Sequence, residues 1–273
     1  MAIKFVDRVP TYPNRIKFTA EDGTVKYGVW ERADSPTVVG TPINAANLNA
    51  MQESSGLSGN VTIYVSTTGS DNTGNGTSGA PYATINKAIN TIPKHLNGFT
   101  ASVFISAGVY NEDVLIKGFS GGEIFLTGTN GAAVVLNSIY VSESYTVRVL
   151  NIAISLSGTV GSEAFYARNS TVFFHTKLTS TSNNSVGVSA ALGCVIYLSD
   201  VEISQKTTSA IRTTTGSEVI IMRITGSDNA VGFGALSGST IKYGISLLSA
   251  SIMNMTEAGS RIYSGAQTSI PNY

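Results

Sequence analysis

Asp200 and Glu202 are the best candidates in this sequence for a pair of catalytic carboxylates. Their i, i+2 spacing in a strand puts both side chains on one face, and paired carboxylates can act as acid and base in glycoside hydrolysis. No acidic cluster builds up at the equivalent positions of the neighbouring repeats, which are Lys177, Thr179, Ile224 and Gly226. We therefore expect a solvated strand edge and no enzymatic activity, with cleavage of a surface polysaccharide as the alternative.

The other reactive side chains lie apart from one another. Cys194 is the only cysteine, and one cysteine with two distant histidines, His95 and His175, cannot build a structural zinc site. Neither histidine has a serine, cysteine or aspartate partner at a recognisable spacing, so we expect structural histidines and a small, buried Cys194. The glycine-rich loop 66–81 lacks Gly-Lys-Ser/Thr and does not predict a phosphate-binding loop. We expect neither a metal nor a cofactor.

The composition limits the classes of partner. Only 12% of the 273 residues are charged and the formal net charge is zero. A neutral chain lacks the basic patch that a nucleic-acid backbone favours, so we do not expect nucleic acid as a partner. The sequence shows no basic start followed by an apolar run and no apolar stretch of about 18 residues. We therefore expect neither a signal peptide nor a membrane span, and synthesis in a cytoplasm.

The first 53 residues differ in texture from the rest, because they are comparatively rich in proline and arginine. Arg15–Thr19 and Val25–Val29 flank an Asp-Gly turn signal, which predicts a hairpin. A short helix capped by Asn44 is expected to follow. Residues 54–60 are rich in serine and glycine and predict a linker. The pattern predicts a separate N-terminal domain.

A repeat occupies the sequence from about residue 101. Short apolar strands recur about every 23 residues, with anchors at Val103, Ile124, Val147, Val172, Val195, Val219, Ile241 and Ile262. Other apolar positions mark further short strands in each period, for example Leu178, Val201, Ile224 and Leu247. The Leu/Asn consensus of a leucine-rich repeat is missing. The repeat predicts an all-β protein, a right-handed parallel β-helix of about eight coils over residues 61–273.

A short amphipathic helix is predicted just before the first coil, over Tyr82–Ile92, with Thr84 as its N-cap. The stack needs its open end covered because an exposed strand edge recruits other strands. We expect this helix to cap the β-helix.

Alternation along the strands predicts which side chains point away from the coil. The anchor residue and the residue two positions later should point inward. Six of the eight positions between them are apolar or aromatic: Phe104, Phe125, Phe173, Ile196, Ile220 and Tyr263. Arg148 and Lys242 interrupt this column. An apolar column is too large to leave exposed, so we expect these six residues to form a homotrimer interface, with the N-terminal segment or a stacked sugar as alternative covers.

Two stretches resemble known families. The first comprises Ile63-Tyr64-Val65-Ser66, Gly69-Ser70-Asp71, Pro81-Tyr82-Ala83-Thr84-Ile85 and Lys87-Ala88-Ile89, continued by Ile105, Gly108, Tyr110 and Glu112. It resembles the opening of pectate-lyase-like β-helix proteins, a superfamily of lyases, hydrolases, adhesins and phage tailspikes. The resemblance implies the fold and leaves the activity open. Hydrolases of the polygalacturonase type need Gly-His-Gly, which this repeat lacks, and the only Arg-Ile-Lys lies at residues 15–17.

The second stretch comprises Phe5-Val6-Asp7-Arg8-Val9-Pro10-Thr11-Tyr12-Pro13-Asn14-Arg15 and Gly40-Thr41-Pro42-Ile43-Asn44-Ala45-Ala46-Asn47-Leu48-Asn49. It resembles the N-terminus of tail proteins in phages and prophages of Gram-positive bacteria. The resemblance implies an anchor that docks onto a tail or baseplate through residues 1–53, and hence location in a virion. The candidate attachment residues are Arg8, Pro10, Tyr12, Pro13, Asn14, Trp30, Pro42, Asn44 and Leu48. We expect a tail fibre or spike that binds a bacterial surface glycan, with a depolymerase or a purely structural baseplate component as alternatives.

Overall fold

A computed structural model of the chain describes residues 15–19, 25–29, 56–129, 131–157, 163–183 and 185–265. The chain divides into two units, residues 1–55 and 56–273. In the first unit β1 (Arg15–Thr19) and β2 (Val25–Val29) pair antiparallel, with Arg15 opposite Val29, which confirms the predicted hairpin. The expected helix at Asn44 lies outside the described residues, as do all the candidate attachment residues: Arg8, Pro10, Tyr12, Pro13, Asn14, Trp30, Pro42, Asn44 and Leu48.

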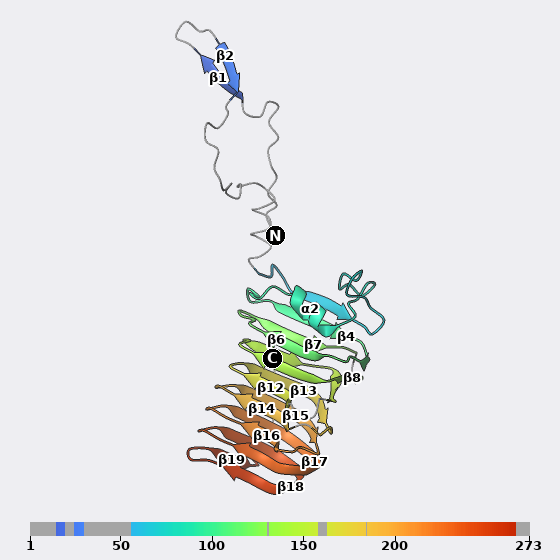
Figure 1. Cartoon of the computed structure of the whole chain (residues 1–273), viewed down its shortest axis with the longest axis vertical. Coiled ribbons are helices and arrows are strands. Elements are labelled where there is room, and N and C mark those ends of the chain that lie inside the picture. Colours follow the sequence, from blue (N-terminus) through green and yellow to red (C-terminus); the bar gives the residue numbers. More distant parts are fainter. Residues whose placement is uncertain are drawn as a thin grey trace. The chain divides into compact units, whose positions relative to one another are not determined.

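The second unit is the predicted right-handed parallel β-helix, with three strands per coil (Figure 1). The β-helix makes about seven turns. Each turn contributes a strand to its first sheet. The strands of this sheet are β3 (Val61–Val65), β4 (Thr100–Ile105), β7 (Glu123–Thr127), β10 (Thr146–Val149), β13 (Thr171–Ser180), β15 (Val195–Ile203), β17 (Glu218–Ala235), β18 (Thr240–Thr256) and β19 (Arg261–Ser264).

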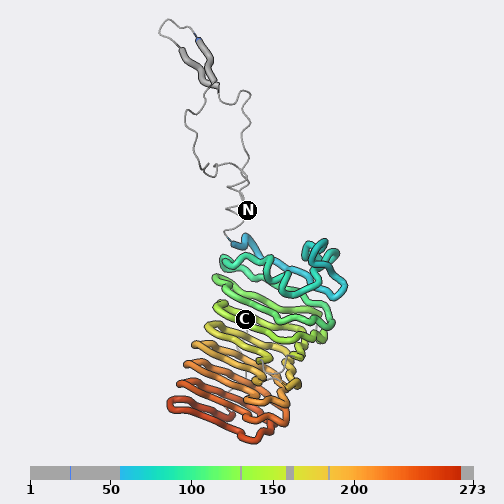
Figure 2. The backbone as a smooth tube through the Cα atoms, in the orientation of Figure 1, coloured from blue at the N-terminus to red at the C-terminus, as the bar shows by residue number. Residues whose placement is uncertain are grey.

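The second and third sheets complete each coil, and the backbone trace in Figure 2 shows the coils stacked one on the next. The second sheet contains the later halves of the long strands together with β5 (Gly108–Val109), β8 (Ala132–Leu136) and β11 (Ile152–Leu156). The third contains the ends of β17 and β18 together with β6 (Asp113–Lys117), β9 (Ser138–Ser142), β12 (Glu163–Arg168), β14 (Val186–Ala191) and β16 (Ser209–Thr213).

One apolar core runs along the inside of the stack. Along a strand such as β7, alternate residues are buried, with Ile124 and Leu126 inside and Phe125 outside. Each inner residue packs on the equivalent residues of the coils above and below, because a single coil cannot bury its own inner face. The core is therefore shared between coils and depends on the stack as a whole.

Helix α2 (Ile85–Thr91) confirms the predicted cap. The Thr84 side chain accepts a hydrogen bond from the backbone N–H of Lys87, which is the expected N-cap. Ile85, Ala88 and Ile89 are buried in the shared core with the first coil. Two carboxylates bind the first turn of the helix: Asp71 accepts from Ala83 and Thr84, and Glu112 accepts from Ile85 and Asn86. Asp71 therefore holds the residues that precede the helix.

In the later coils a column of small residues, all buried except the half-buried Ser260, lies at the turn before the first sheet. These residues immediately precede the paired strands and are Ser170, Cys194, Ser217, Ser239 and Ser260. Several of the serine hydroxyls accept a backbone N–H from the preceding coil, as Ser217 does from Cys194 at 3.2 Å and Ser260 from Gly238 at 3.0 Å. The column satisfies backbone donors at the turn and sets the register of the strand that follows.

The predicted register is wrong by one residue at β15. The anchor Val172 pairs with Ile196, and Ile196 pairs with Val219. Ile196 therefore lies in the core, whereas Val195 and Tyr197 point outward. The reason is that Cys194 occupies the position of the turn serines, so the strand begins one residue later than the apolar pattern indicated. A one-residue slip exchanges the two faces of a strand.

The same alternation corrects two further positions. The period placed Leu247 in line with Leu178, Val201 and Ile224, but Ser246 is the residue that pairs with Ile224. Leu247 pairs with Thr225 on the outer side of the second sheet. Phe104 points outward as predicted, but it lies two residues beyond the predicted column position. Ser102 is the residue that pairs with Phe125, and Phe104 pairs with Thr127.

Candidate functional site

Asp200 and Glu202 lie on one outer face, as their spacing predicted, but each carboxylate is neutralised by a cation of an adjacent coil. Asp200 pairs with Arg223 of the next coil at 2.6 Å, and Glu202 pairs with Lys177 of the preceding coil at 2.8 Å. The register positions one coil later are Arg223 and Thr225, which corrects the predicted Ile224 and Gly226. The two carboxylates are thus used to join coils.

The same use of charge recurs throughout the β-helix. Every side-chain ion pair identified among the described residues joins different coils, and five of the six join direct neighbours. The exception, Arg212–Glu163 at 2.5 Å, spans two coils. Surface ion pairs contribute little individually, and here they connect the coils.

The outer column of the first sheet forms a second candidate surface. In register it comprises Ser102, Phe125, Arg148, Phe173, Tyr197, Ile220, Lys242 and Tyr263. The rings of Phe173 and Tyr197 stack on each other at 4.7 Å between centroids, and the Arg148 guanidinium lies 4.3 Å from the Phe173 centroid. Phe173 is thus contacted by two neighbours in the column, and one face of Tyr197 is covered by Phe173.

This column leaves less apolar surface for another chain than the sequence indicated. Ile196 is inside the coil, and Phe173 and Ile220 are already buried within the single chain. Of the six predicted interface residues, only Tyr263 is among the strongly exposed apolar side chains. The stacking stabilises the coil, since aromatic pairs and cation–π contacts each contribute about 0.5–1.5 kcal/mol.

The histidines and the cysteine have local roles. His95 Nδ1 and Ser120 Oγ are 3.1 Å apart, and the ring of His175 stacks near Phe173. Burial, with a contribution from Arg148, lowers the pKa of His175. Cys194 is buried, as expected, and burial raises the pKa of its thiol to about 12. None of these groups is set up as a nucleophile.

A hollow of about 560 Å³ lies at the turns between the third and first sheets, and we call it the Tyr145 hollow. Its wall combines three serines, two aromatic rings, a carboxylate, an amide and two threonines. The lining residues are Phe119, Ser120, Glu143, Ser144, Tyr145, Thr146, Asn169, Ser170, Thr171 and Gly193. The carboxylate of Glu143 accepts a hydrogen bond from Arg168 at 3.2 Å, which fixes it at the rim.

Tyr145 breaks the pattern of the turn column. It immediately precedes Thr146, which pairs with Thr171, so it takes the place that Ser170 takes in the next coil. The residues at this position in the next four coils are small and buried, whereas the Tyr145 side chain is 70% exposed. Small residues close the same turn in the next coils, so the Tyr145 ring is not needed there. We therefore consider Tyr145 as a contact for a ligand.

The backbone around the hollow is ordinary for this fold. Glu143 and Asn169 have positive φ angles of 52° and 48°, which non-glycine residues rarely adopt. The same turn position has a positive φ in the following coils too, at Leu192, Thr215 and Ser237. The conformation is therefore a property of the repeating turn, and only the side chains distinguish the hollow.

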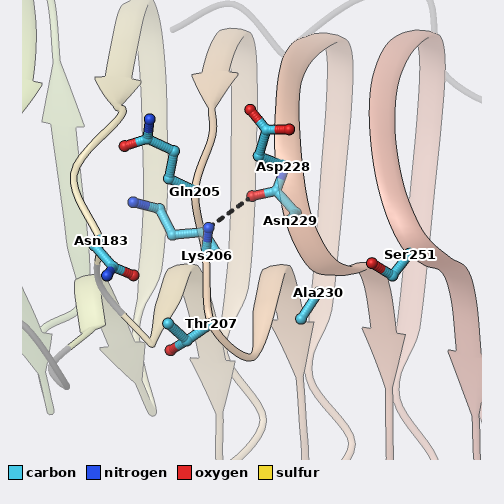
Figure 3. Close-up of a pocket in the computed structure, with 8 residues that line it drawn as sticks. All are labelled: Asn183, Gln205, Lys206, Thr207, Asp228, Asn229, Ala230 and Ser251. Carbon is cyan, nitrogen blue, oxygen red and sulfur yellow. Dashed lines mark hydrogen bonds between the residues drawn. The ribbon is translucent and has the colours of Figure 1, made fainter.

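A second pocket, of about 520 Å³, lies at the turns between the second and third sheets (Figure 3). It is lined by Asn183, Gln205, Lys206, Thr207, Asp228, Asn229, Ala230 and Ser251. Lys206 is almost completely buried, and in Figure 3 its side chain extends toward the coil of Asn183. Its ammonium donates to the backbone carbonyl of Ser182, and burial lowers its pKa to about 8. Lys206 thereby joins two coils.

The side chains of the Tyr145 hollow are suited to binding a polyhydroxylated ligand. An exposed aromatic ring offers an apolar platform with a polar end, and the surrounding hydroxyl, amide and carboxylate groups can donate and accept hydrogen bonds. The described residues contain no cluster of three or more histidine, cysteine, aspartate or glutamate side chains that could hold a metal ion. No helix in the described ranges is long and apolar enough to cross a membrane.

Comparisons with protein-family models, with curated proteins and with solved structures find no match to this chain.

The sequence prediction missed Tyr145, although the signal was present. Once the turns are aligned on the strand starts, Tyr145 is a large residue at a position that holds Gly122 in the preceding coil and serine or cysteine in the later coils. Tyr145 is uncharged, so a pattern of charged catalytic side chains does not identify it.

Proposed function

We propose that this protein is a non-catalytic receptor-binding component of a phage tail. In this proposal it docks through residues 1–53, acts as a homotrimer and presents the β-helix to a glycan on a bacterial surface. The attachment and the virion setting rest on the resemblance of the N-terminal sequence. The binding role rests on the Tyr145 hollow.

The observation that carries the binding role is the exposed ring of Tyr145 at a position where later coils have small buried residues. An exposed aromatic side chain beside polar groups provides a platform that is useful in recognition. Glu143 and Asn169 flank it with groups that hydrogen-bond sugar hydroxyls. A sugar ring placed on Tyr145 would reach both.

Binding is preferred to cleavage because of the ion pairs at Asp200 and Glu202. Glycoside hydrolysis needs one carboxyl group to donate a proton and another to act as base or nucleophile. Both oxygens of Asp200 accept hydrogen bonds from Arg223, and Glu202 is paired with Lys177. Neither carboxylate is positioned for a substrate.

A binding screen of the purified full chain against cell-wall and surface glycans of Gram-positive bacteria, with analysis of the products, tests the proposal. We expect retention of at least one glycan without release of new reducing ends. Release of reducing ends would contradict the non-catalytic role and support a depolymerase. Absence of binding to every host glycan would contradict the receptor role and support a purely structural baseplate component.

A further inference from the structure

Lys94 lies beside the Tyr145 hollow and forms no ion pair with a described residue. Its ammonium is 3.8 Å from the centroid of the Phe119 ring, and its backbone carbonyl accepts a hydrogen bond from Ser120 at 2.9 Å. Phe119 and Ser120 both line the hollow. Partial burial lowers the pKa of Lys94. The ring holds this cation by a cation–π contact, but no described carboxylate neutralises it.

Lys117 is a second cation at the hollow, on the side of the third sheet. It pairs in the sheet with Ser142, and Ser142 pairs with Arg168 of the next coil. Ser142 immediately precedes Glu143, a lining residue. Lys117 is exposed, and within the described ranges it has no ion-pair partner. Its ammonium is therefore available to a ligand.

The charges beside the hollow do not cancel. Lys94, Lys117 and Arg168 contribute three positive charges and Glu143 contributes one negative charge, which leaves two positive charges in excess. The chain as a whole has a formal net charge of zero, so the excess is local. A hollow surrounded by one sign of charge concentrates ligands of the opposite sign.

A further carboxylate close to the hollow is already neutralised. Glu123 pairs in the sheet with Thr146, which lines the hollow. Arg148 donates a hydrogen bond to this carboxylate at 3.1 Å. The Arg148–Glu123 pair adds no net charge, so it does not offset Lys94 and Lys117.

We propose that the Tyr145 hollow binds an anionic saccharide, with a sugar ring on Tyr145 and phosphate or carboxylate groups beside Lys94 and Lys117. The proposal rests on the receptor role proposed above and adds the charge of the ligand to it. A lysine ammonium binds an anionic group as a point charge with three hydrogen-bond donors. The amide of Asn169 remains for the sugar hydroxyls. A neutral glycan would leave both ammonium groups without a partner.

The test is titration calorimetry of the full chain with three probes: a glucosylated poly(glycerol phosphate), an oligogalacturonate and a neutral oligogalactoside. At least one anionic probe should bind roughly tenfold more tightly than the neutral one. Raising sodium chloride from about 0.1 M to about 1 M shortens the Debye length from about 10 Å to about 3 Å. The affinity for the anionic probe should fall over this range. The two anionic probes distinguish recognition of phosphate from recognition of carboxylate.

The double variant Lys94→Gln/Lys117→Gln should bind the anionic probe roughly tenfold more weakly at low salt. Lys94→Arg retains the charge and the contact with Phe119, so it should bind as the wild type does. Lys177→Gln is the matched control, because it removes one positive charge from the second sheet, where Lys177 pairs with Glu202. Circular dichroism should show that every variant is folded, since Lys94 and Lys117 are exposed.

Tighter binding of the neutral probe, unchanged affinity in the double variant or absence of binding to all three probes would overturn the proposal. Equal retention of double-stranded DNA would also overturn it, because charge alone would then account for binding. Tyr145→Ala separates the two claims. Glycan binding that depends on Tyr145 but shows no preference for an anionic probe would leave the receptor role and refute the charge assignment. Anionic binding that is lost in the lysine variant but survives in Tyr145→Ala would place the anion site outside the hollow and refute the proposal.

Discussion

The guanidinium of Arg223 donates two hydrogen bonds to the carboxylate of Asp200 in the preceding coil, from Nε to Oδ1 at 3.1 Å and from Nη2 to Oδ2 at 2.6 Å. A bidentate pair of this kind occupies both carboxylate oxygens with one cation. The pair connects two coils on an outer face.

Asp200→Asn should therefore bind glycan as the wild type does. Neither protein should cleave the bound glycan. The substitution weakens one exposed inter-coil pair, so the thermal unfolding midpoint should change little. Reducing ends released from bound glycan should stay at the blank level for both proteins. Release by the wild type that disappears in Asp200→Asn would show that the pair is catalytic.

Ile89→Asp should destabilise the whole β-helix. Ile89 is completely buried between α2 and the first coil, and an unpaired charge there costs about 3–5 kcal/mol. Chemical denaturation followed by circular dichroism measures the loss. Asn90→Asp is the matched control, because it places the same charge on an exposed position of the same helix. Equal unfolding free energies for the two variants would contradict the capping role of α2.

Asp71 should make folding sensitive to acid. Burial acts to raise its pKa, but the hydrogen bonds from Thr84 and Ala83 and the charge of Lys87 together hold the pKa below its ordinary value of 3.8. A depressed pKa in the folded state gives stability that is present above about pH 4 and is lost as the pH falls through the folded-state value. Urea unfolding between pH 6 and pH 2.5 should show this loss.

Asp71→Asn should flatten that dependence, because the substituted side chain cannot titrate. Asp228→Asn is a suitable control, since this exposed aspartate accepts a hydrogen bond only from its neighbour Ser227 among the bonds described. An acid dependence identical in wild type and Asp71→Asn would contradict the role assigned to the helix-start carboxylate.

Cys194 should be inert in the folded protein. Its thiol is buried and burial raises its pKa to about 12, so almost no thiolate forms at pH 8. A disulfide reagent should label it only after unfolding in guanidinium chloride. Cys194→Ser should fold normally, because serine occupies the same turn position in neighbouring coils. Rapid labelling of the native protein would contradict the position of Cys194 in the turn column.

The fold was predictable because its signals are local and repeated. The period of the strands, the Thr84 cap and the hairpin between Arg15 and Val29 each depend on short-range patterns. The register at β15 was not predictable from alternation alone, because Val195 and Ile196 are both apolar and either parity buries a hydrophobic side chain. The turn position of Cys194 decides the register, and that role is visible only when the backbone hydrogen bonds of the turn are known.

The candidate site was harder to predict, because neighbours across coils determine what a side chain can do. The sequence alone does not show that Arg223, 23 residues later, pairs with Asp200. Tyr145 is distinguished only by comparison with the equivalent side chains of the next four coils, which are small and buried. Contacts across coils depend on a register that must be correct to the residue.

Glycan affinity of a Tyr145 variant tests the central claim most directly. A glycan selected by the binding screen would be titrated calorimetrically into wild type, Tyr145→Ala and Tyr263→Ala, the last being an exposed tyrosine outside the hollow. We predict at least a tenfold weaker affinity for Tyr145→Ala, about 1.4 kcal/mol, and wild-type affinity for Tyr263→Ala. Equal affinities for all three proteins would contradict the claim that the Tyr145 hollow is the receptor site.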